Sequence, residues 1–349
     1  MSNVVALRFA QRPNRAETLT ALAHVVATGR RGPNDMFWLK ENAEFLNVMA
    51  ALNEPLEEDA LAAYQTFYDT VGEKLDFFPQ YYRFLLSITL DLEDLGMPGT
   101  HGAKLCAKVQ RAGWAEAELS DLQRAEARRL LARRGAATRD TDNMTDRLMR
   151  FAERSQTFAV PNKKAAYELT HIAFYLSDYG RRDPQFSAEA KRSLEFAGLV
   201  AFIDQNFDLL AEVCTAMRFA GMMPHHTWTA AIAQAHAAIR PVAPAVRAAD
   251  AYHAYMMTGW ANALAGETSF DAEITVQSAT FEDMRPGESV LRSLSEGLLA
   301  LGAARRGTWA GMQGRVVPFL SASDRHIFQQ AQASTEHFDA FFALFARTT

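Results

Sequence analysis

The stretch Pro161–Gly180 reads PNKKAAYELTHIAFYLSDYG and predicts a helix with a clear start and a clear end. Asn162 can accept hydrogen bonds from the free N–H groups of a first turn. Gly180 can take the left-handed conformation that commonly follows a last turn. The sequence between them is helical in its spacing, so we take this segment as the element around which the chain is organised.

Both sides of this predicted helix carry residues that favour contact with protein. One side presents apolar residues at helical spacing: Ala165, Leu169, Ile172 and Leu176. The opposite side presents Tyr167, His171, Phe174 and Asp178. After Lys164 the only long charged side chain is Glu168, whereas a surface helix carries a charged, solvated face. The pattern predicts a helix that packs on one side and lines a polar cavity on the other.

Residues that can end helices recur along the whole chain. They lie between 38 and 45 residues apart, at Asn53, Gly96, Gly135, Gly180, Gly221, Gly259 and Gly302. The mean spacing is about 41 residues, the length of a two-helix repeat. We therefore expect an all-α fold of αα-hairpins that form an α/α toroid or a curved solenoid. Chance similarity is the competing explanation, because glycine at helix ends is common.

The composition places the chain among ordinary globular proteins. It has 349 residues with 49% hydrophobic and 22% charged residues, and its net charge of −5 gives no reason to expect a nucleic-acid partner. Its two cysteines, Cys106 and Cys214, are isolated, which favours a reducing compartment. Neither a signal peptide nor a stretch of about 20 apolar residues is present. We expect a soluble, cytoplasmic protein without a membrane partner.

Three segments depart from this pattern within an expected single domain, 1–349. Residues 1–15 are expected to form a flexible arm. Residues 266–288 read GETSFDAEITVQSATFEDMRPGE, a polar insertion that is either a lid over the cavity or a surface loop. Residues 324–349 end in HFDAFFALFAR, an aromatic helix that either caps the array or forms a homodimer contact.

Three polar residues are the candidates for catalysis. His171 and Asp178 share one face of the central helix, and His253 lies in a similarly apolar helix. In a closed ring they would face one cavity, where they could serve as acid and base or bind a divalent metal ion. The alternative is that they are buried structural residues. The side chains expected to contact a small-molecule ligand or to support these groups are Tyr167, Glu168, Phe174, Tyr175, Glu212 and Tyr252.

Asp204, Asp208 and Glu212 recur every four residues and would form an acidic stripe on one helix. Such a stripe can hold Mg²⁺ against a diphosphate, which suggests a prenyl-diphosphate enzyme. A solvated helix face is the alternative. Five arginines between Arg124 and Arg134 form a basic cluster. It either contacts an acidic partner or is a solvated face paired with nearby glutamates.

Several strings resemble a group of uncharacterised bacterial all-α proteins with a Thr-His-x-x-Phe-Tyr-x-x-Asp-x-Gly signature. The signature stands here as THIAFYLSDYG from Thr170, with DLLAE and YHAY downstream and FWLKENAEFLNV upstream. The last of these looks like an α-proteobacterial domain of unknown function. The resemblance covers about residues 37 to 259 and implies no activity. Within it, His171, Asp178, Glu212 and His253 fall in the recurrent strings.

The sequence therefore leads to two main functional hypotheses. The first is an enzyme or small-molecule binder with a polar cavity. The second is a non-catalytic helical scaffold that binds a protein or peptide. Enclosure of His171 and His253 in one pocket favours the first, and their separate burial favours the second.

Overall fold

The computed structural model describes residues 13–136, 142–244, 250–285 and 289–348. Within these ranges the chain is mostly helical, so the all-α prediction is confirmed. Most of the arm expected over residues 1–15 lies outside the described residues, and α1 already begins at Arg15. Among the described residues, none of the helices combines the length and apolar character that a bilayer-spanning helix requires.

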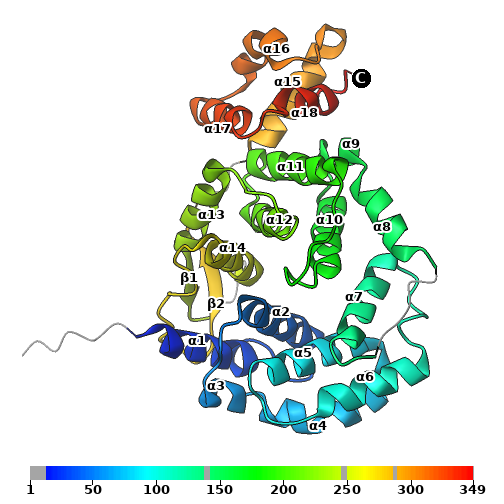
Figure 1. Cartoon of the computed structure of the whole chain (residues 1–349). Coiled ribbons are helices and arrows are strands. Elements are labelled where there is room, and N and C mark those ends of the chain that lie inside the picture. Colours follow the sequence, from blue (N-terminus) through cyan, green and yellow to red (C-terminus); the bar gives the residue numbers. More distant parts are fainter. Residues whose placement is uncertain (1–12, 137–141, 245–249, 286–288, 349) are drawn as a thin grey trace, which may run out of the picture.

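One set of helices surrounds the centre of the molecule (Figure 1). They are α2 (Met36–Leu52), α5 (Tyr82–Asp94), α7 (Asp121–Ala132), α10 (Lys163–Leu176), α12 (Phe207–Phe219) and α14 (Tyr252–Ala265). Each contacts the next in this order, and α14 contacts α2. The first and last helices of the set are therefore neighbours in space.

A second set of helices lies outside the first (Figure 1). It comprises α1 (Arg15–His24) with the π-helical turn Val25–Gly29, α3 (Glu58–Ala62), α4 (Gln65–Phe77), α6 (His101–Ala112), α8 (Met144–Ala152), α9 (Ser155–Phe158), α11 (Ala188–Ile203) and α13 (His226–Ala238). Because they cover the inner helices, α12 is buried along almost its whole length. This explains why its sequence lacks a solvated face.

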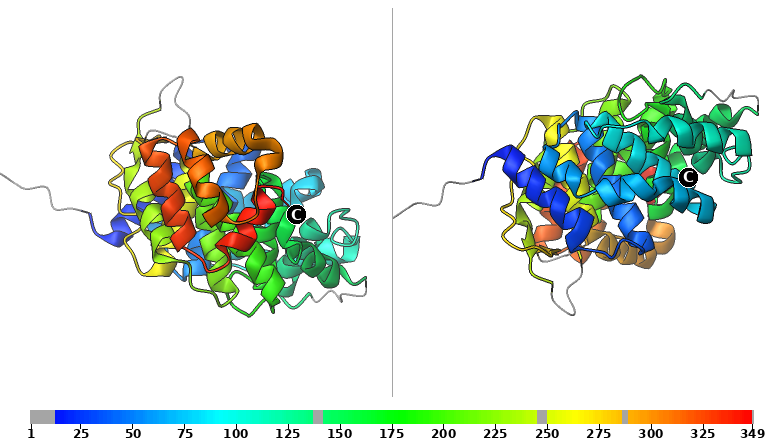
Figure 2. Two further views of the ribbon diagram at one scale, coloured as in Figure 1. Left: turned by 90° about the horizontal axis from the view of Figure 1, so that it is seen from above. Right: turned by 90° about the horizontal axis from the view of Figure 1, so that it is seen from below.

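The C-terminal helices form a separate group against α11. They are α15 (Val290–Leu301), α16 (Trp309–Val316), α17 (Ala322–Ala333) and α18 (Phe338–Phe345). Figure 1 shows them at one end of the molecule, and this end faces the viewer in the left view of Figure 2. The expected single helix over residues 324–349 is therefore two helices. Aromatic packing explains the cluster, because the rings of Trp309 and Phe328 lie 4.5 Å apart, and Phe338 and Phe342 stack beside them.

Most of the predicted helix ends take the left-handed backbone conformation. Asn53 has φ 53°, and positive φ values recur at Gly96, Gly135, Gly180, Gly221 and Gly302. Gly259 is the exception, because α14 continues through it to Gly266. A Cβ atom at Gly259 would lie 2.4 Å from a ring carbon of Phe270. This glycine permits close packing and does not end a helix, so the prediction at this position was wrong.

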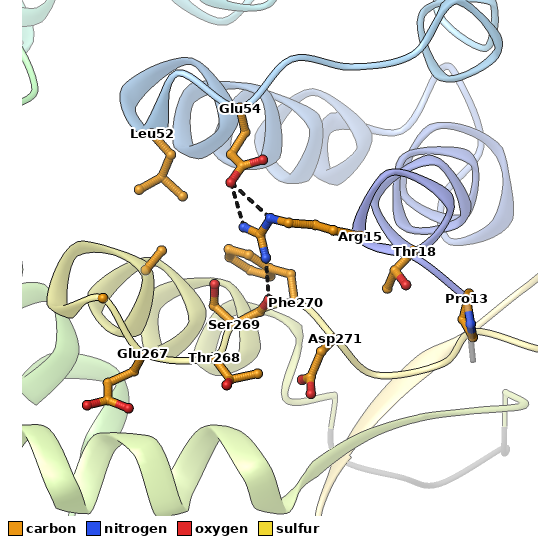
Figure 3. A pocket seen from close by; sticks show the side chains of 12 residues that line it. Pro13, Arg15, Thr18, Leu52, Glu54, Glu267, Thr268, Ser269, Phe270 and Asp271 are labelled. Atoms are coloured by element: carbon orange, nitrogen blue, oxygen red, sulfur yellow. Dashed lines mark hydrogen bonds and ion pairs between the residues drawn. The ribbon is translucent and has the colours of Figure 1, made fainter. Parts of the chain in front are cut away.

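Residues 266–285 lie outside the inner helices. None of them lines the cavity at the centre of these helices. They include β2 (Thr280–Asp283), which pairs antiparallel with β1 (Ile239–Val242). Arg15 donates to the Ser269 carbonyl oxygen at 2.9 Å and pairs with Glu54, beside a surface pocket of about 550 Å³ (Figure 3). The segment thus joins α14 to α1 and is not the lid that its polarity suggested, although residues 286–288 lie outside the described ranges.

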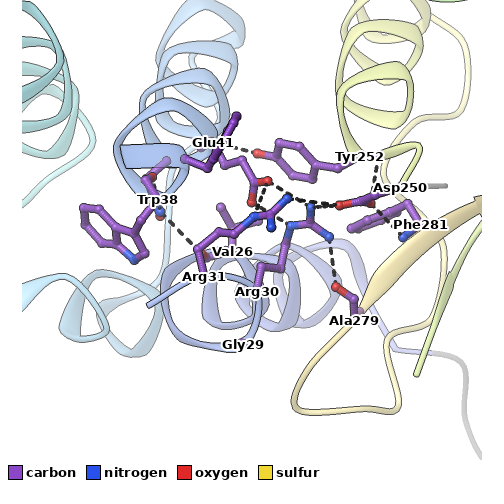
Figure 4. A network of polar contacts seen from close by, with 12 residues as sticks. Val26, Gly29, Arg30, Arg31, Trp38, Glu41, Asp250, Tyr252, Ala279 and Phe281 are labelled. Atoms are coloured by element: carbon purple, nitrogen blue, oxygen red, sulfur yellow. Dashed lines mark hydrogen bonds and ion pairs between the residues drawn. The ribbon is translucent and has the colours of Figure 1, made fainter. Parts of the chain in front are cut away.

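A buried ionic network joins α14 to α2 (Figure 4). The Arg30 guanidinium is 2% exposed, lies 2.9 Å from the Glu41 carboxylate, and also pairs with Asp250. It donates to the Ala279 carbonyl oxygen and lies 4.4 Å from the centre of the Tyr252 ring. Because Phe281 of β2 donates its N–H to Asp250, the network connects the first and last inner helices with β2.

Candidate functional site

The inner helices line a partly open cavity of about 450 Å³. This volume lies within the range of small-molecule sites, which are about 300–1,000 Å³. All six inner helices contribute to its wall. The lining residues are Lys40, Ala43, Glu44, Asn47, Val48, Arg83, Phe84, Ser87, Gln123, Glu126, Arg129, His171, Phe174, Tyr175, Tyr179, Glu212, His253, Met257 and Trp260.

Glu212 lies between two imidazole rings on this wall. Its side chain is 2% exposed. One carboxylate oxygen, Oε2, accepts a 2.6 Å hydrogen bond from the Thr170 hydroxyl and lies 3.8 Å from His171 Nδ1. The other, Oε1, lies 3.8 Å from His253 Nε2. Both distances exceed that of a direct hydrogen bond, so the imidazoles act on Glu212 through their charge.

His253 is held in position by hydrogen bonds behind the cavity wall. Its Nδ1 donates to Asp208 Oδ1 at 2.7 Å, and Asp208 Oδ2 accepts from the Tyr167 hydroxyl at 2.9 Å. This fixes the ring so that Nε2 faces Glu212 and lies 3.6 Å from Glu44 Oε1. The orientation of His253 is therefore set by Asp208 and Tyr167.

His171 is oriented by its own helix. Its Nδ1 lies 2.7 Å from the carbonyl oxygen of Tyr167, one turn earlier. A carbonyl oxygen only accepts hydrogen bonds, so Nδ1 is the protonated nitrogen and donates to it.

Burial and neighbouring charges shift the pKa values of two carboxyl groups and of His253 in this site. Burial raises the pKa of Glu212, although the nearby His171 and His253 oppose this. Burial also raises the pKa of Glu44. For His253, burial lowers the pKa, but the hydrogen bond and charge of Asp208 outweigh burial and raise it to about 9. His253 is therefore an imidazolium ion at neutral pH, beside two carboxyl groups whose pKa values are raised by burial.

We expect this arrangement to make stability depend on pH. The pKa of His253 is about 9 in the folded chain and near 6.5 without its partners, so the folded state binds the proton more tightly. The stabilisation is complete below about pH 6.5 and is lost as the pH rises through about 9. The raised pKa values of Glu44 and Glu212 act in the same direction.

Urea unfolding at several pH values measures this effect. We expect the free energy of unfolding to fall by about 1–3 kcal/mol between pH 6.5 and pH 9.5, at about 1.4 kcal/mol per unit of pKa difference before screening. Screening reduces the effect because the His253 side chain is 33% exposed. His253→Gln should lose most of this dependence, and an equally steep fall in that variant would contradict the assignment.

Aromatic rings form another part of the cavity wall. Trp260 packs against Phe174, with ring centres 5.1 Å apart, and stacks on Tyr179 at 5.9 Å. The Arg129 guanidinium lies 4.5 Å from the centre of the Tyr179 ring. Aromatic packing between α10 and α14 thus forms part of the cavity wall.

An unusual turn carries Tyr179 into this wall. Helix α10 ends at Leu176, earlier than Gly180 suggested. Asp178 and Tyr179 have φ values of 48° and 54°, and Gly180 has 84°. Positive φ is uncommon outside glycine, and such strain clusters at functional sites. The turn is held by the Tyr179 N–H, which donates to the Phe174 carbonyl oxygen, and by an ion pair of Asp178 with Arg129 at 3.1 Å.

The residues selected from the sequence occupy three kinds of position. His171, Phe174, Tyr175, Glu212 and His253 line the cavity, and Tyr167 supports it through Asp208. Asp178 pairs with Arg129, and Glu168 is half-buried outside the lining. Tyr252 lies in the buried ionic network around Arg30, where its hydroxyl donates to the Glu41 backbone carbonyl oxygen at 2.8 Å. The expected ligand set of His171, Asp178 and His253 is not assembled, and no group of three or more metal-binding side chains occurs among the described residues.

The acidic stripe is divided between two helices. Asp204 ends α11 and pairs with Lys163 at 3.0 Å, whereas Asp208 and Glu212 lie on α12. Asp208 is bonded to His253, and Glu212 is buried beside it. The prediction of one continuous carboxylate stripe was therefore wrong, because the chain turns between Asp204 and Asp208.

Most residues of the wall were not identified from the sequence, among them Glu44 and Arg129. Glu44 is one of several polar residues in the otherwise apolar α2. A charged residue in such a helix was the sequence feature that could have identified it. Arg129 was assigned to a solvated basic face, yet its side chain is 4% exposed. Arg133 is similarly buried, with its side chain 6% exposed and paired with Asp91 and Asp94, so the prediction of a solvated basic face was wrong.

A family model described as Domain of unknown function (DUF6902) matches residues 1–348. Comparisons with curated proteins and with solved structures found no match.

Proposed function

We propose that this chain, which belongs to the family Domain of unknown function (DUF6902), is an enzyme that performs acid–base chemistry on a small molecule in the central cavity. The observation that carries the proposal is the position of Glu212. Its carboxyl group is 2% exposed, lines the cavity and lies 3.8 Å from both His171 and His253. Groups with perturbed pKa values in a cleft are typical of catalytic sites.

We also propose that the inner and outer helices together form an α/α toroid built from αα-hairpins. The contacts between consecutive inner helices, and between α14 and α2, support this architecture. In such a ring, residues from distant repeats meet at one centre.

Each polar group has a distinct role in this proposal. Glu212 is the general acid, because burial raises its pKa and favours the protonated form that donates. His253 is an imidazolium ion that stabilises negative charge on the ligand or on Glu212 after proton transfer. Asp208 and Tyr167 act through His253 and are positioning residues.

The proposal is favoured over a non-catalytic scaffold by the shared location of the histidines. A scaffold was expected to bury His171 and His253 separately, whereas both line the same cavity. A magnesium-dependent prenyl-diphosphate enzyme is disfavoured, because Asp204 and Asp208 already have partners on different elements.

A ligand screen with matched variants tests the proposed function. A chemically diverse metabolite library is screened by thermal shift, since a ligand that binds only the native state raises the melting temperature. Hits are then incubated with the protein, and product formation is followed by mass spectrometry. We expect Glu212→Gln to keep ligand binding and to lower turnover by about 10²–10⁴-fold.

The matched control is Glu168→Gln, which makes the same change outside the cavity lining on α10. It should retain parental turnover. Equal turnover in the parent and in Glu212→Gln would show that Glu212 is not the acid. Binding that is unaffected by Ala43→Leu, which adds bulk to the cavity wall on α2, would show that this cavity is not the site.

A further inference from the structure

The imidazole ring of His171 has one nitrogen, Nε2, without a polar partner among the described residues. The polar contacts of this side chain are all made by the other nitrogen, Nδ1. It lies 2.7 Å from the Tyr167 carbonyl oxygen, 3.4 Å from the Thr170 hydroxyl and 3.8 Å from Glu212 Oε2. Because Nδ1 donates to the carbonyl oxygen, Nε2 carries the lone pair of the neutral ring and can accept a proton.

This nitrogen lies on the accessible edge of the ring. The His171 side chain is 36% exposed and lines the central cavity. Its Nδ1 edge is covered by the Tyr167 carbonyl oxygen, so the exposed surface belongs to the opposite edge, which carries Nε2. The Phe174 and Tyr175 rings lie 5.6 Å and 5.7 Å from the imidazole and limit its rotation. A ligand in the cavity can therefore reach Nε2.

Other polar groups of the wall are less available as proton acceptors. His253 has a pKa of about 9, so it is an imidazolium ion without a lone pair at neutral pH. Glu126 is paired with Arg83, and Glu44 lies 3.6 Å from Nε2 of the His253 imidazolium ion. A ligand proton can thus meet Nε2 of His171 without displacing a partner.

From this geometry we infer that His171 is the general base of the site and accepts a proton from the ligand at Nε2. The inference rests on the proposed function, in which Glu212 is the general acid. The ligand gives a proton to Nε2 and keeps the electron pair of the broken bond, while the Glu212 carboxyl group gives a proton to a second atom of the ligand. The ligand loses one proton and gains one, so the step needs no oxidant or reductant.

The two charges that this step creates lie close together. After the transfer, Nδ1 of the His171 imidazolium ion and Oε2 of the Glu212 carboxylate are 3.8 Å apart, so the two groups attract each other. The Thr170 hydroxyl donates to the same Oε2 at 2.6 Å and stabilises the carboxylate. Proton exchange with water then restores the neutral imidazole and the carboxyl group.

Carbethoxylation tests the chemical state of Nε2 without a known substrate. Diethyl pyrocarbonate acylates imidazole nitrogens that carry a lone pair, and peptide mass spectrometry assigns each modified histidine. At neutral pH we expect His171 to react within about tenfold of the rate of His326, which is exposed on α17, and His253 at least about tenfold more slowly because it is protonated. An unreactive His171 would overturn the inference, whatever the substrate is.

Turnover of a compound from the metabolite library tests the catalytic role. His171→Gln should lower kcat/KM by about 10²–10⁴-fold and remove the rise of kcat/KM with pH that reports a base. In His171→Ala, added imidazole should restore part of the turnover, because it supplies the missing base, whereas it cannot replace a purely structural histidine. The matched control is His24→Gln on α1. This histidine is 41% exposed and lies outside the cavity lining, so the variant should retain the parental pH profile.

The remaining outcomes separate this inference from the proposed function. If Glu212→Gln lowers turnover but His171→Gln does not, or if imidazole restores no turnover to His171→Ala, the inference fails and the proposed function stands. If no library compound is turned over in the cavity, both fail.

Discussion

Replacing Arg30 by methionine is expected to lower the free energy of unfolding by about 3–5 kcal/mol, the usual cost of removing one partner from a buried ionic network. The Arg30 side chain is 2% exposed and its partner Glu41 is 8% exposed. Methionine fills similar space but leaves the Glu41 and Asp250 carboxylates and the Ala279 carbonyl oxygen without this donor. Urea unfolding followed by circular dichroism measures the change.

Arg31→Met is the matched control for this prediction. Arg31 contacts the same two carboxylates, at 3.0 Å from Glu41 and 3.6 Å from Asp250, but its side chain is 36% exposed. Because exposed ion pairs contribute about 0–1 kcal/mol, we expect a small effect. Equal losses in the two variants would show that burial of Arg30 does not determine the stability of the contact between α14 and α2.

Replacing Phe270 by alanine is expected to destabilise the fold by about 3–5 kcal/mol, as is typical of a buried phenylalanine. Phe270 is fully buried, and its ring packs against Tyr255 and His236. Its backbone N–H also donates to His236 Nε2 at 3.2 Å. The substitution would leave a cavity above Gly259, where the absence of a side chain admits the ring.

This variant also tests the assignment of residues 266–285 to the outer wall. If the segment is an integral part of the fold, thermal unfolding of Phe270→Ala shifts as one transition to lower temperature. Phe77→Ala is the control, because Phe77 is 78% exposed and should change stability by no more than about 0.5 kcal/mol. A Phe270→Ala protein as stable as the control would mean that the segment is only loosely attached.

The local features of the fold could be predicted from the sequence because helix formation depends on neighbouring residues. Asp35 and Asn162 cap α2 and α10, as expected from their positions before helical patterns. Asn53 takes the left-handed conformation that ends α2. The periodicity of residues 161–180 also assigned His171 and Phe174 to one face, and both line the cavity.

The candidate site could be predicted only in part, because its contacts join residues that are distant in sequence. Asp178 looked like a cavity residue, yet it binds Arg129, 49 positions earlier. Asp208 looked like part of a surface stripe, yet it orients His253, 45 positions later. Helical spacing gives the face on which a residue lies, but not the partner opposite that face.

The sequence by itself thus determined that the chain is helical, where most helices begin and end, and which helices are too apolar to lie on the surface. The tertiary structure decided which polar residues meet, that Glu44 joins Glu212 and His253, and that Gly259 admits an aromatic ring. The physical reason is that backbone hydrogen bonds and caps act within a few residues. Burial, charge pairing and close packing depend on the neighbours that the folded chain brings together.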